Sequence, residues 1–482
     1  MRRFFAKNLL FVMSVNLLVK PIWIFMIDRT VQNTVGHASY GIYQALFNLG
    51  LVFQILLDFG INNYNSRSLA QNPKRIRILF PPMITARLLL SVFYVAIVCG
   101  IGLLIGYRGW QMWMLTGVLL IQTLNSLMLF IRSSVSGLHR FKADGLLSVA
   151  DRLLMILLCG FLLFYPATSK NFKIEWFVGA QIICYSVAVI MGLVVLRTIA
   201  NARLVFSLDT KRITRIIRDS LPYATLIFLM SIYTRADTML VERLLGTEGR
   251  EQAGVYAAAY RLLDVGNMFG LMFASMLLPV FGRLLAQKST VQPIVQLCVN
   301  LLLPVSILIT VSAIYFRSEL MHLLYRNTTE QSIAVFAWLM LAFPAFSLSN
   351  VYSTLLTANG DLKLMNKIAI LGVAINLVLN FVLIPKYQSL GAAFAACITQ
   401  SVLAICFIIF AQKQTALERN KRWALSFVFF LFLLLGLGYG IRLAPVPWFL
   451  QLIVLFMMGV ATIFLFRFVS LKAVKQLLEK RQ

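Results

Sequence analysis

The chain has 482 residues, of which 60% are hydrophobic and only 13% charged, and its mean hydropathy is +0.84. This apolar share is well above that of soluble domains and indicates a polytopic membrane protein without a separate soluble domain. The formal net charge of +27 would suit a nucleic-acid-binding protein, but the positions of the basic residues between apolar runs argue against nucleic acid as a partner.

Apolar runs of about 20 residues recur along the whole sequence, each long enough to cross a bilayer as a helix. Because the runs are continuously apolar rather than alternating, we expect helices and not barrel strands. The predicted fold is all-α with about 14 transmembrane helices, at residues 8–28, 39–63, 78–105, 111–136, 146–166, 176–197, 221–243, 254–283, 293–316, 331–357, 366–385, 391–412, 423–441 and 448–467.

The basic residues concentrate in the loops on one side of these spans, including Lys413, Arg419, Lys421 and Arg422. The positive-inside rule places those loops and both termini in the cytoplasm. The first span follows a basic segment without a small-residue cleavage site, which is typical of an uncleaved signal anchor. The sequence therefore predicts a multi-pass protein of a bacterial cytoplasmic (inner) membrane, in contact with membrane lipids.

Short motifs recur at a nearly constant offset and indicate an internal duplication. Gly41-Ile42-Tyr43 opens the second span and Gly254-Val255-Tyr256 opens the eighth, while Asp28-Arg29 and Glu242-Arg243 end the first and seventh. Such self-similarity is the mark of a repeated unit. We predict a six-helix bundle at 1–219, a second, pseudo-symmetric one at 220–412, and two extra helices with a basic amphipathic tail at 413–482.

Charged residues lie deep inside two of the predicted spans. Arg235 and Asp237 fall within the seventh span, and Arg261 and Asp264 lie one helical turn apart in the eighth. Each charge at bilayer depth costs roughly 2.5 to 3.5 kcal/mol even on lenient scales, so such groups normally face a bundle interior or a hydrated cavity. We expect a polar cavity within the membrane.

The internal repeat aligns Lys20 of the first span with Arg235 to within one residue. If the two halves face each other, Lys20 and Arg235 lie on opposite walls of one cavity, and Arg261 reaches a comparable depth. Three cations against the carboxylates of Asp237 and Asp264 leave this cavity positive, so it favours an anionic headgroup over a cationic drug. Asp237 and Asp264 would orient the cations or couple an ion.

A structural alternative is that these five residues form interhelical ion pairs without touching a substrate. Lys20 could also snorkel to the membrane surface, and snorkelling is the interpretation that we adopt for Arg87 and Arg132, which lie near the cytoplasmic ends of their spans. Three further residues, Asp58, Asp151 and Arg152, are secondary site candidates.

Two regions of the sequence resemble a known family. The stretch 36–70, with Tyr40-Gly41-Ile42-Tyr43 and Leu57-Asp58-Phe59-Gly60, is similar to the second-helix region of Wzx-type polysaccharide flippases. Asp237 with the stretch 253–262 resembles the seventh and eighth helices of the same family. These flippases belong to the multidrug/oligosaccharidyl-lipid/polysaccharide (MOP) exporter superfamily, which also contains drug antiporters and the lipid II flippase.

The resemblance implies alternating access and a substrate that is an undecaprenyl-diphosphate-linked oligosaccharide, such as an O-antigen unit of lipopolysaccharide. It also implies no cofactor, coupling to H⁺ or Na⁺ as an option, and a polysaccharide polymerase and other glycan-assembly proteins as potential partners. A cation-coupled multidrug antiporter of the same superfamily is the alternative.

A membrane glycosyltransferase or polysaccharide polymerase is a more distant alternative, because the loops are short and carry no nucleotide-binding or nucleophile motif. We therefore predict that the protein is not an enzyme. The six cysteines all fall in predicted spans and the three histidines are isolated, so no disulfide framework or metal site is expected.

Overall fold

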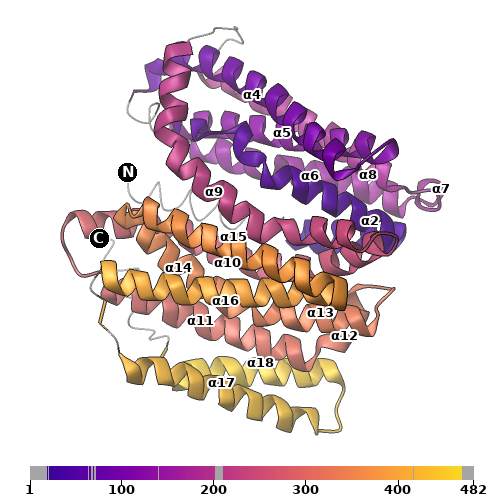
Figure 1. The fold of residues 1–482 in the computed structure, drawn as a ribbon, viewed down its shortest axis with the longest axis vertical. Helices are drawn as coiled ribbons and strands as arrows, with labels where there is room; N and C mark the ends of the chain where they lie inside the picture. The colour runs from indigo at the N-terminus through magenta and orange to yellow at the C-terminus, as the bar shows by residue number, and fades with distance from the viewer. Residues whose placement is uncertain are drawn as a thin grey trace. The chain divides into compact units, whose positions relative to one another are not determined.

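The computed structural model describes residues 19, 21–62, 65–66, 69, 72–138, 140–200, 210–415, 417–418 and 420–468. Over these residues every regular element is a helix (Figure 1), which confirms the predicted all-α class. The chain divides into two compact units, Met1–Gly254 and Val255–Gln482. The predicted boundary at residue 219 and the six-plus-six-plus-two organisation stay predictions.

Among the described residues, the first unit contains ten elements and the beginning of an eleventh, α10. They are the π-helix η1 (Trp23–Asp28), α2 (Arg29–Val52), the 3₁₀ turns η2 (Gln54–Leu57) and η3 (Pro73–Arg75), α4 (Ile76–Ile105), α5 (Trp110–Gly137), α6 (Phe141–Phe164), α7 (Pro166–Ser169), α8 (Ile174–Ala200), α9 (Thr210–Leu244) and the first turns of α10 (Gly249–Ala286). Within it α5 and α6 pack on α8, and α9 packs on α2.

The second unit consists of the rest of α10 with α11 (Gln292–Tyr315), α12 (Arg317–Leu324), α13 (Glu330–Leu341), α14 (Phe343–Asn359), α15 (Leu362–Tyr387), α16 (Ser389–Gln414), α17 (Lys421–Arg442) and α18 (Trp448–Leu465). Its centre is formed by α16, which packs on α13, α14 and α15, and α11 packs on α14. The predicted tail helix after residue 469 lies outside the described residues.

Eleven helices among the described residues are long and apolar enough to cross a membrane. They correspond to the predicted spans other than the first, second and eighth. The first falls largely outside the described residues, and the eighth lies within α10, a helix of 38 residues. The tenth is interrupted where α13 meets α14, because Pro344 in the first turn of α14 cannot donate to the preceding helix. The prediction of about 14 spans is consistent with this architecture.

The second predicted span, 39–63, is wrong in its boundaries. The helix after the first span continues to Gly36, where a backbone φ of 81° breaks it, and the second segment ends at Val52. A 3₁₀ turn and a bend with Phe59 and Gly60 at positive φ follow. The motif Leu57-Asp58-Phe59-Gly60 therefore lies in an unwound stretch, where freed backbone and side-chain groups need partners inside the protein.

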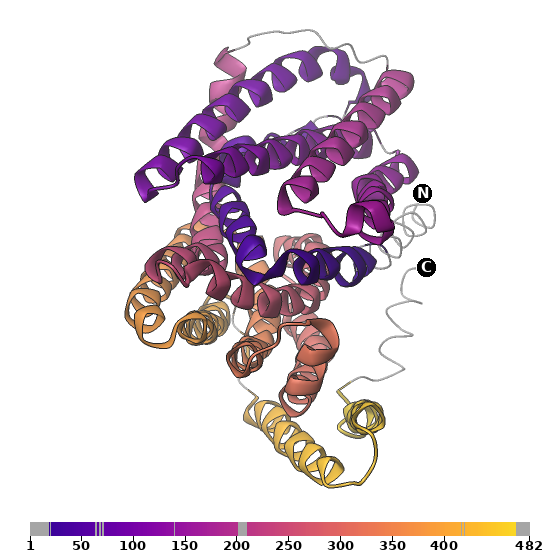
Figure 2. The same ribbon diagram turned by 90° about the vertical axis from the view of Figure 1, so that its right-hand side faces the viewer.

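The two C-terminal helices, α17 and α18, pack on α11 of the same unit. Both views show them as a yellow pair at the edge of the second unit (Figure 1, Figure 2). Gly438 of α17 lies against the Tyr315 ring, and Gly459 of α18 lies against Leu308. The absence of a side chain at each glycine lets the helices approach closely. The Tyr315 hydroxyl also donates to the Leu435 carbonyl at 2.8 Å.

Candidate functional site

The structure places the predicted charged residues on two helices. Arg235 and Asp237 lie on α9 in the first unit, whereas Arg261 and Asp264 lie on α10 in the second. Asp237 is buried, with 2% of its surface exposed, and the other three are half-buried. All four have interaction partners. Lys20, the fifth member of the predicted site, lies outside the described residues.

Asp237 is held in place by the packing of α9 on α2. The adjacent Thr238 accepts a hydrogen bond from the Asn48 amide at 3.1 Å, and both side chains are buried. A buried polar bond of this kind fixes the rotation of α9 about its axis, because breaking it would leave two unsatisfied groups. The rotation of α9 in turn fixes the direction of Asp237.

Arg87 does not snorkel, so this prediction is wrong. Its side chain on α4 is 1% exposed and forms an ion pair with Asp58. It also donates to the Ser126 carbonyl at 2.9 Å and to the Asn62 amide oxygen at 2.6 Å, and its guanidinium lies over the Phe130 ring. Asp58 lies in the unwound segment after Val52 and Asn62 directly follows that segment, and the sequence alone could not place either beside Arg87.

Arg132 has an internal partner, because its Nε lies 2.8 Å from the Asp144 carboxylate, while 25% of its side chain is exposed, and its snorkelling stays a prediction. The secondary candidates Asp151 and Arg152 are adjacent on α6 and their charged groups are 3.5 Å apart. The Arg152 guanidinium lies over the rings of Trp23 and Tyr185 at 5.4 and 5.9 Å. Arg87, Arg132 and Arg152 thus each have a carboxylate within the first unit, which favours a structural role.

The sequence did not reveal a buried polar cluster around Asp28 in the first unit. Asp28, at the end of the π-helix η1, is 3% exposed and accepts a hydrogen bond from the Tyr40 hydroxyl at 2.9 Å. Gln44 donates to the same hydroxyl at 2.8 Å. A π-helical turn inside a longer helix is frequent at functional sites. The four-residue spacing of Tyr40 and Gln44, which puts both on one helix face, is the signal that could have revealed it.

Aromatic rings and amides connect this polar cluster to α8. Trp23 stacks on Phe177, and Tyr43 meets the same ring edge-on. Tyr43 also exchanges hydrogen bonds with the buried Gln181 amide, whose nitrogen lies 3.0 Å from the hydroxyl. The interior of the first unit therefore contains a polar region lined by η1, α2, α6 and α8, with Asp28 and Asp151 as its carboxylates.

Tyr107, in the loop between α4 and α5, connects this loop to the end of α9 within the first unit. The Tyr107 hydroxyl donates to the Glu242 carboxylate at 3.1 Å, and the Arg243 guanidinium lies 3.5 Å from the centre of its ring. Burial raises the pKa of Tyr107 above its ordinary value. Tyr107 therefore stays protonated and acts as a hydrogen-bond donor at physiological pH.

Two glycines of the repeated motif meet at the same end of the first unit. A Cβ on Gly41 would lie 1.9 Å from the Arg250 carbonyl oxygen, and a Cβ on Gly254 would lie 2.1 Å from the His37 carbonyl oxygen. The contacts are reciprocal, since each glycine touches the residue four positions before the other. Side chains are excluded here because backbone lies against backbone.

In the part of the chain that the structure describes, no group of three His, Cys, Asp or Glu side chains is arranged to hold a metal ion. The donors present are single carboxylates with amides and hydroxyls, which suit proton exchange and hydrogen bonding.

Comparison with known proteins identifies the family. Residues 5–285 match the family described as polysaccharide biosynthesis protein. The chain belongs to this family. Residues 222–382 also match the MatE family, and a search of curated proteins gives no match.

Solved structures of the MOP superfamily have the same fold as this family member. The lipid II flippase MurJ in an inward closed conformation has a TM-score of 0.64 at 14% identity, covering 96% of this chain and 97% of MurJ. An inward-facing multidrug resistance MATE family transporter has a TM-score of 0.61 at 14% identity, covering 83% and 94%. The Vibrio cholerae MATE transporter VcmN in its bent form has a TM-score of 0.57 at 14% identity, covering 85% and 98%.

These similarities confirm the predicted membership of the MOP superfamily and the predicted fold. This polysaccharide biosynthesis family member is a multi-pass membrane protein with the fold of these solved flippase and transporter structures.

Proposed function

We propose that this protein moves an undecaprenyl-diphosphate-linked oligosaccharide from the cytoplasmic to the periplasmic leaflet of a bacterial inner membrane by alternating access. The observation that carries the proposal is the match of residues 5–285 to the polysaccharide biosynthesis protein family. The excess of cations over carboxylates among the five predicted site residues supports it, because a diphosphate is anionic.

In this proposal Lys20, Arg235 and Arg261 attract the diphosphate, and Asp237 and Asp264 orient them or carry a coupling proton or sodium ion. The half-burial of Arg235 and Arg261 supports this role, since Arg87, whose side chain is 1% exposed and bonded to protein groups, has little surface left for a ligand. Glycan-assembly proteins, including a polymerase, would act on the product.

Replacement of the two described cations tests this function. We expect Arg235→Ala and Arg261→Ala each to reduce surface glycan at least tenfold in a strain that depends on this protein, because the loss of one charge-assisted hydrogen bond of about 1.5–3 kcal/mol corresponds to roughly a tenfold or larger effect. Surface glycan is measured by labelling of intact cells, and correct insertion by the amount of full-length protein in membranes.

The matched control is Arg108→Ala, which removes an exposed arginine of the loop between α4 and α5. If Arg235→Ala and Arg261→Ala both export glycan fully at normal protein levels, Arg235 and Arg261 have no role in substrate binding.

A cation-coupled multidrug antiporter is the second candidate. It is favoured by the match of residues 222–382 to the MatE family and by the buried carboxylate of Asp28 with its Tyr40 and Gln44 partners, a group that could exchange a proton. Overexpression that raises drug resistance, and loses this effect with Asp28→Asn, would favour the antiporter over the flippase.

A further inference from the structure

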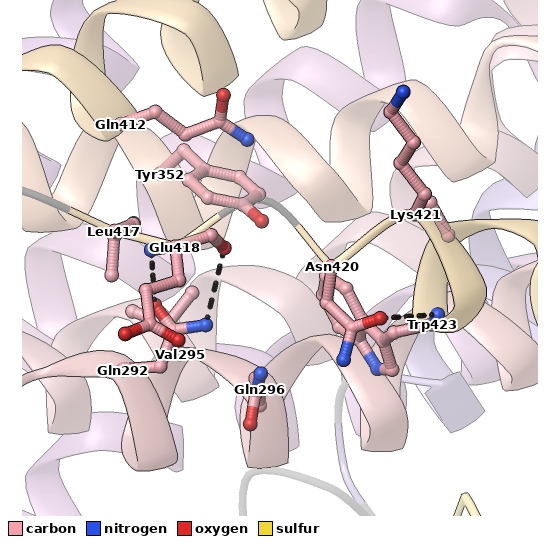
Figure 3. Close-up of a pocket in the computed structure, with 11 residues that line it drawn as sticks. Gln292, Val295, Gln296, Tyr352, Gln412, Leu417, Glu418, Asn420, Lys421 and Trp423 are labelled. Carbon is pink, nitrogen blue, oxygen red and sulfur yellow. Dashed lines mark hydrogen bonds between the residues drawn. The ribbon is translucent and has the colours of Figure 1, made fainter.

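Polar bonds fix the extra helices α17 and α18 to the second unit at both ends. Where α11 begins, Gln292 exchanges two hydrogen bonds with the backbone of Glu418, at 3.1 and 3.4 Å (Figure 3). At the opposite end, Arg442 in the last turn of α17 forms an ion pair with Glu319 of α12. Its guanidinium also lies 5.0 Å from the centre of the Phe316 ring. The surface between α12 and the start of α18 therefore has a defined shape.

This surface contains an open pocket of about 420 Å³. The pocket lies on the side of the membrane that the sequence predicts to be periplasmic, and its volume is within the range of ligand pockets. It is lined by four residues of α12 and the first residue of α18, namely Ser318, Glu319, His322, Leu323 and Trp448.

Glu319 contributes a carboxylate oxygen that lacks a donor. Its Oε1 accepts a hydrogen bond from Arg442, whereas its Oε2 is buried and has no hydrogen-bond partner among the described residues. Buried polar atoms are normally hydrogen-bonded, and an unsatisfied acceptor costs free energy. Because Glu319 lines the pocket, a hydrogen-bond donor bound there would satisfy this oxygen.

His322 contributes a second acceptor to the same pocket. Its Nδ1 lies 2.8 Å from the Ser318 carbonyl oxygen. A carbonyl oxygen can only accept, so Nδ1 carries the proton and Nε2 of the neutral ring is an acceptor. The ring is exposed, and Nε2 is therefore open to a ligand that donates hydrogen bonds.

An ammonium group fits this lining. It donates up to three hydrogen bonds and is attracted to the face of an indole ring such as that of Trp448. The negative charge of Glu319 favours a cation over a neutral hydroxyl. Two arginines, the exposed Arg317 and the partly exposed Arg442, lie next to Glu319 in sequence or in space and provide positive charge for a phosphate. Together these groups suit a headgroup that carries both an ammonium and a phosphate.

The apolar residues around the pocket indicate that such a headgroup belongs to a lipid. Leu323 lines the pocket, Leu443 follows Arg442 and Phe449 follows Trp448, and all three are largely exposed. Exposed apolar side chains of a membrane protein face the lipid, and tryptophans at the ends of membrane-spanning helices lie at the level of the headgroups. The pocket therefore lies where a phospholipid can reach it.

We propose that this pocket binds the headgroup of a phospholipid with a primary ammonium group. Glu319 and His322 accept hydrogen bonds from the ammonium, Trp448 lies beside it, and Arg442 contacts the phosphate. The proposal depends only on the second unit and holds whichever substrate the protein transports.

Binding to the full-length protein in detergent, measured by native mass spectrometry, tests the proposal. We expect dihexanoyl-phosphatidylethanolamine to saturate one site and to bind about tenfold more tightly than dihexanoyl-phosphatidylcholine, which has the same charges but no N–H donor. Dihexanoyl-phosphatidylglycerol, which has no ammonium, should also bind more weakly. Equal binding of the ethanolamine and choline lipids, or no saturable site for the ethanolamine lipid, would overturn the proposal.

A water-soluble headgroup distinguishes a lipid from a free compound of the same chemistry. We expect glycerophosphoethanolamine, which has the headgroup without acyl chains, to bind more weakly than dihexanoyl-phosphatidylethanolamine, because it cannot contact the exposed apolar residues around the pocket. Equal affinities of the two would contradict the assignment to a lipid.

Single substitutions locate the site. Glu319→Gln and His322→Ala should each weaken binding of the ethanolamine lipid roughly three- to tenfold and reduce its advantage over the choline lipid, because they remove acceptors for N–H groups. Trp448→Leu should weaken both lipids, because both carry a cation that an indole ring attracts. His322 is exposed, so its replacement tests the site even if Glu319→Gln lowers stability.

The matched controls are Glu330→Gln, at the exposed start of α13, and Trp113→Leu, on the exposed surface of α5. Neither residue lines the pocket, so both variants should bind the ethanolamine lipid as the unmodified protein does. An unchanged affinity in Glu319→Gln and His322→Ala, or an equal loss in the controls, would contradict the proposed site.

Discussion

The interactions of Arg87 offset the cost of burying its charge. It is the most buried arginine among the described residues and has a carboxylate, an amide oxygen, a carbonyl and an aromatic ring around it. Asp58, in contrast, keeps 28% of its side-chain surface exposed. The two members of the pair therefore differ in what their removal leaves behind.

Asp58→Ala should destabilise the protein by about 3–5 kcal/mol, because it leaves the Arg87 charge buried without its counter-ion. The double variant Asp58→Ala/Arg87→Met should recover part of this loss, since the uncompensated charge is gone. Thermal unfolding of the purified protein in detergent measures both. A midpoint for Asp58→Ala equal to that of the unmodified protein would contradict the structural role of the pair.

At the scale of elements, helix packing explains why glycine recurs at the same place in the repeated motif. Gly41 and Gly254 recur at an offset of 213 residues in the sequence, and in the structure each packs against the backbone four residues before the other. A helix start that approaches another backbone this closely cannot carry a side chain. The motif is therefore explained by a contact rather than by a ligand.

Gly41→Ala and Gly254→Ala should both be poorly tolerated, because the added Cβ would overlap a carbonyl oxygen at about 2 Å. We expect losses of about 2 kcal/mol or more, within the range of overpacked cores. The controls are Gly100→Ala and Gly179→Ala, helical positions where a Cβ meets no atom within 4 Å; these should be neutral or stabilising by up to about 1 kcal/mol. Equal behaviour of the two pairs in thermal unfolding would refute the close contact.

At the scale of the whole molecule, the distribution of basic loops predicts the orientation in the membrane. The loop around Asn171, between α7 and α8, should face the periplasm, and the loop around Ser289, between α10 and α11, should face the cytoplasm. Both residues are exposed. The six native cysteines lie in helices and are replaced before labelling.

In the cysteine-free protein, Asn171→Cys should react with a membrane-impermeant maleimide in intact spheroplasts, whereas Ser289→Cys should react only after the membrane is permeabilised. Labelling is measured as a mass shift of the purified protein. The reverse pattern would invert the topology and move both termini to the periplasm.

The sequence by itself determined the helical membrane fold, the superfamily and the position of the apolar runs, because hydropathy over 20 residues follows directly from composition. It also located Arg235, Asp237, Arg261 and Asp264 within membrane spans, although their roles stay predictions. Only the tertiary structure decided that Arg87 meets Asp58 and that Asp28 meets Tyr40. These partners depend on where a helix unwinds and how helices pack, and hydropathy carries no information about either.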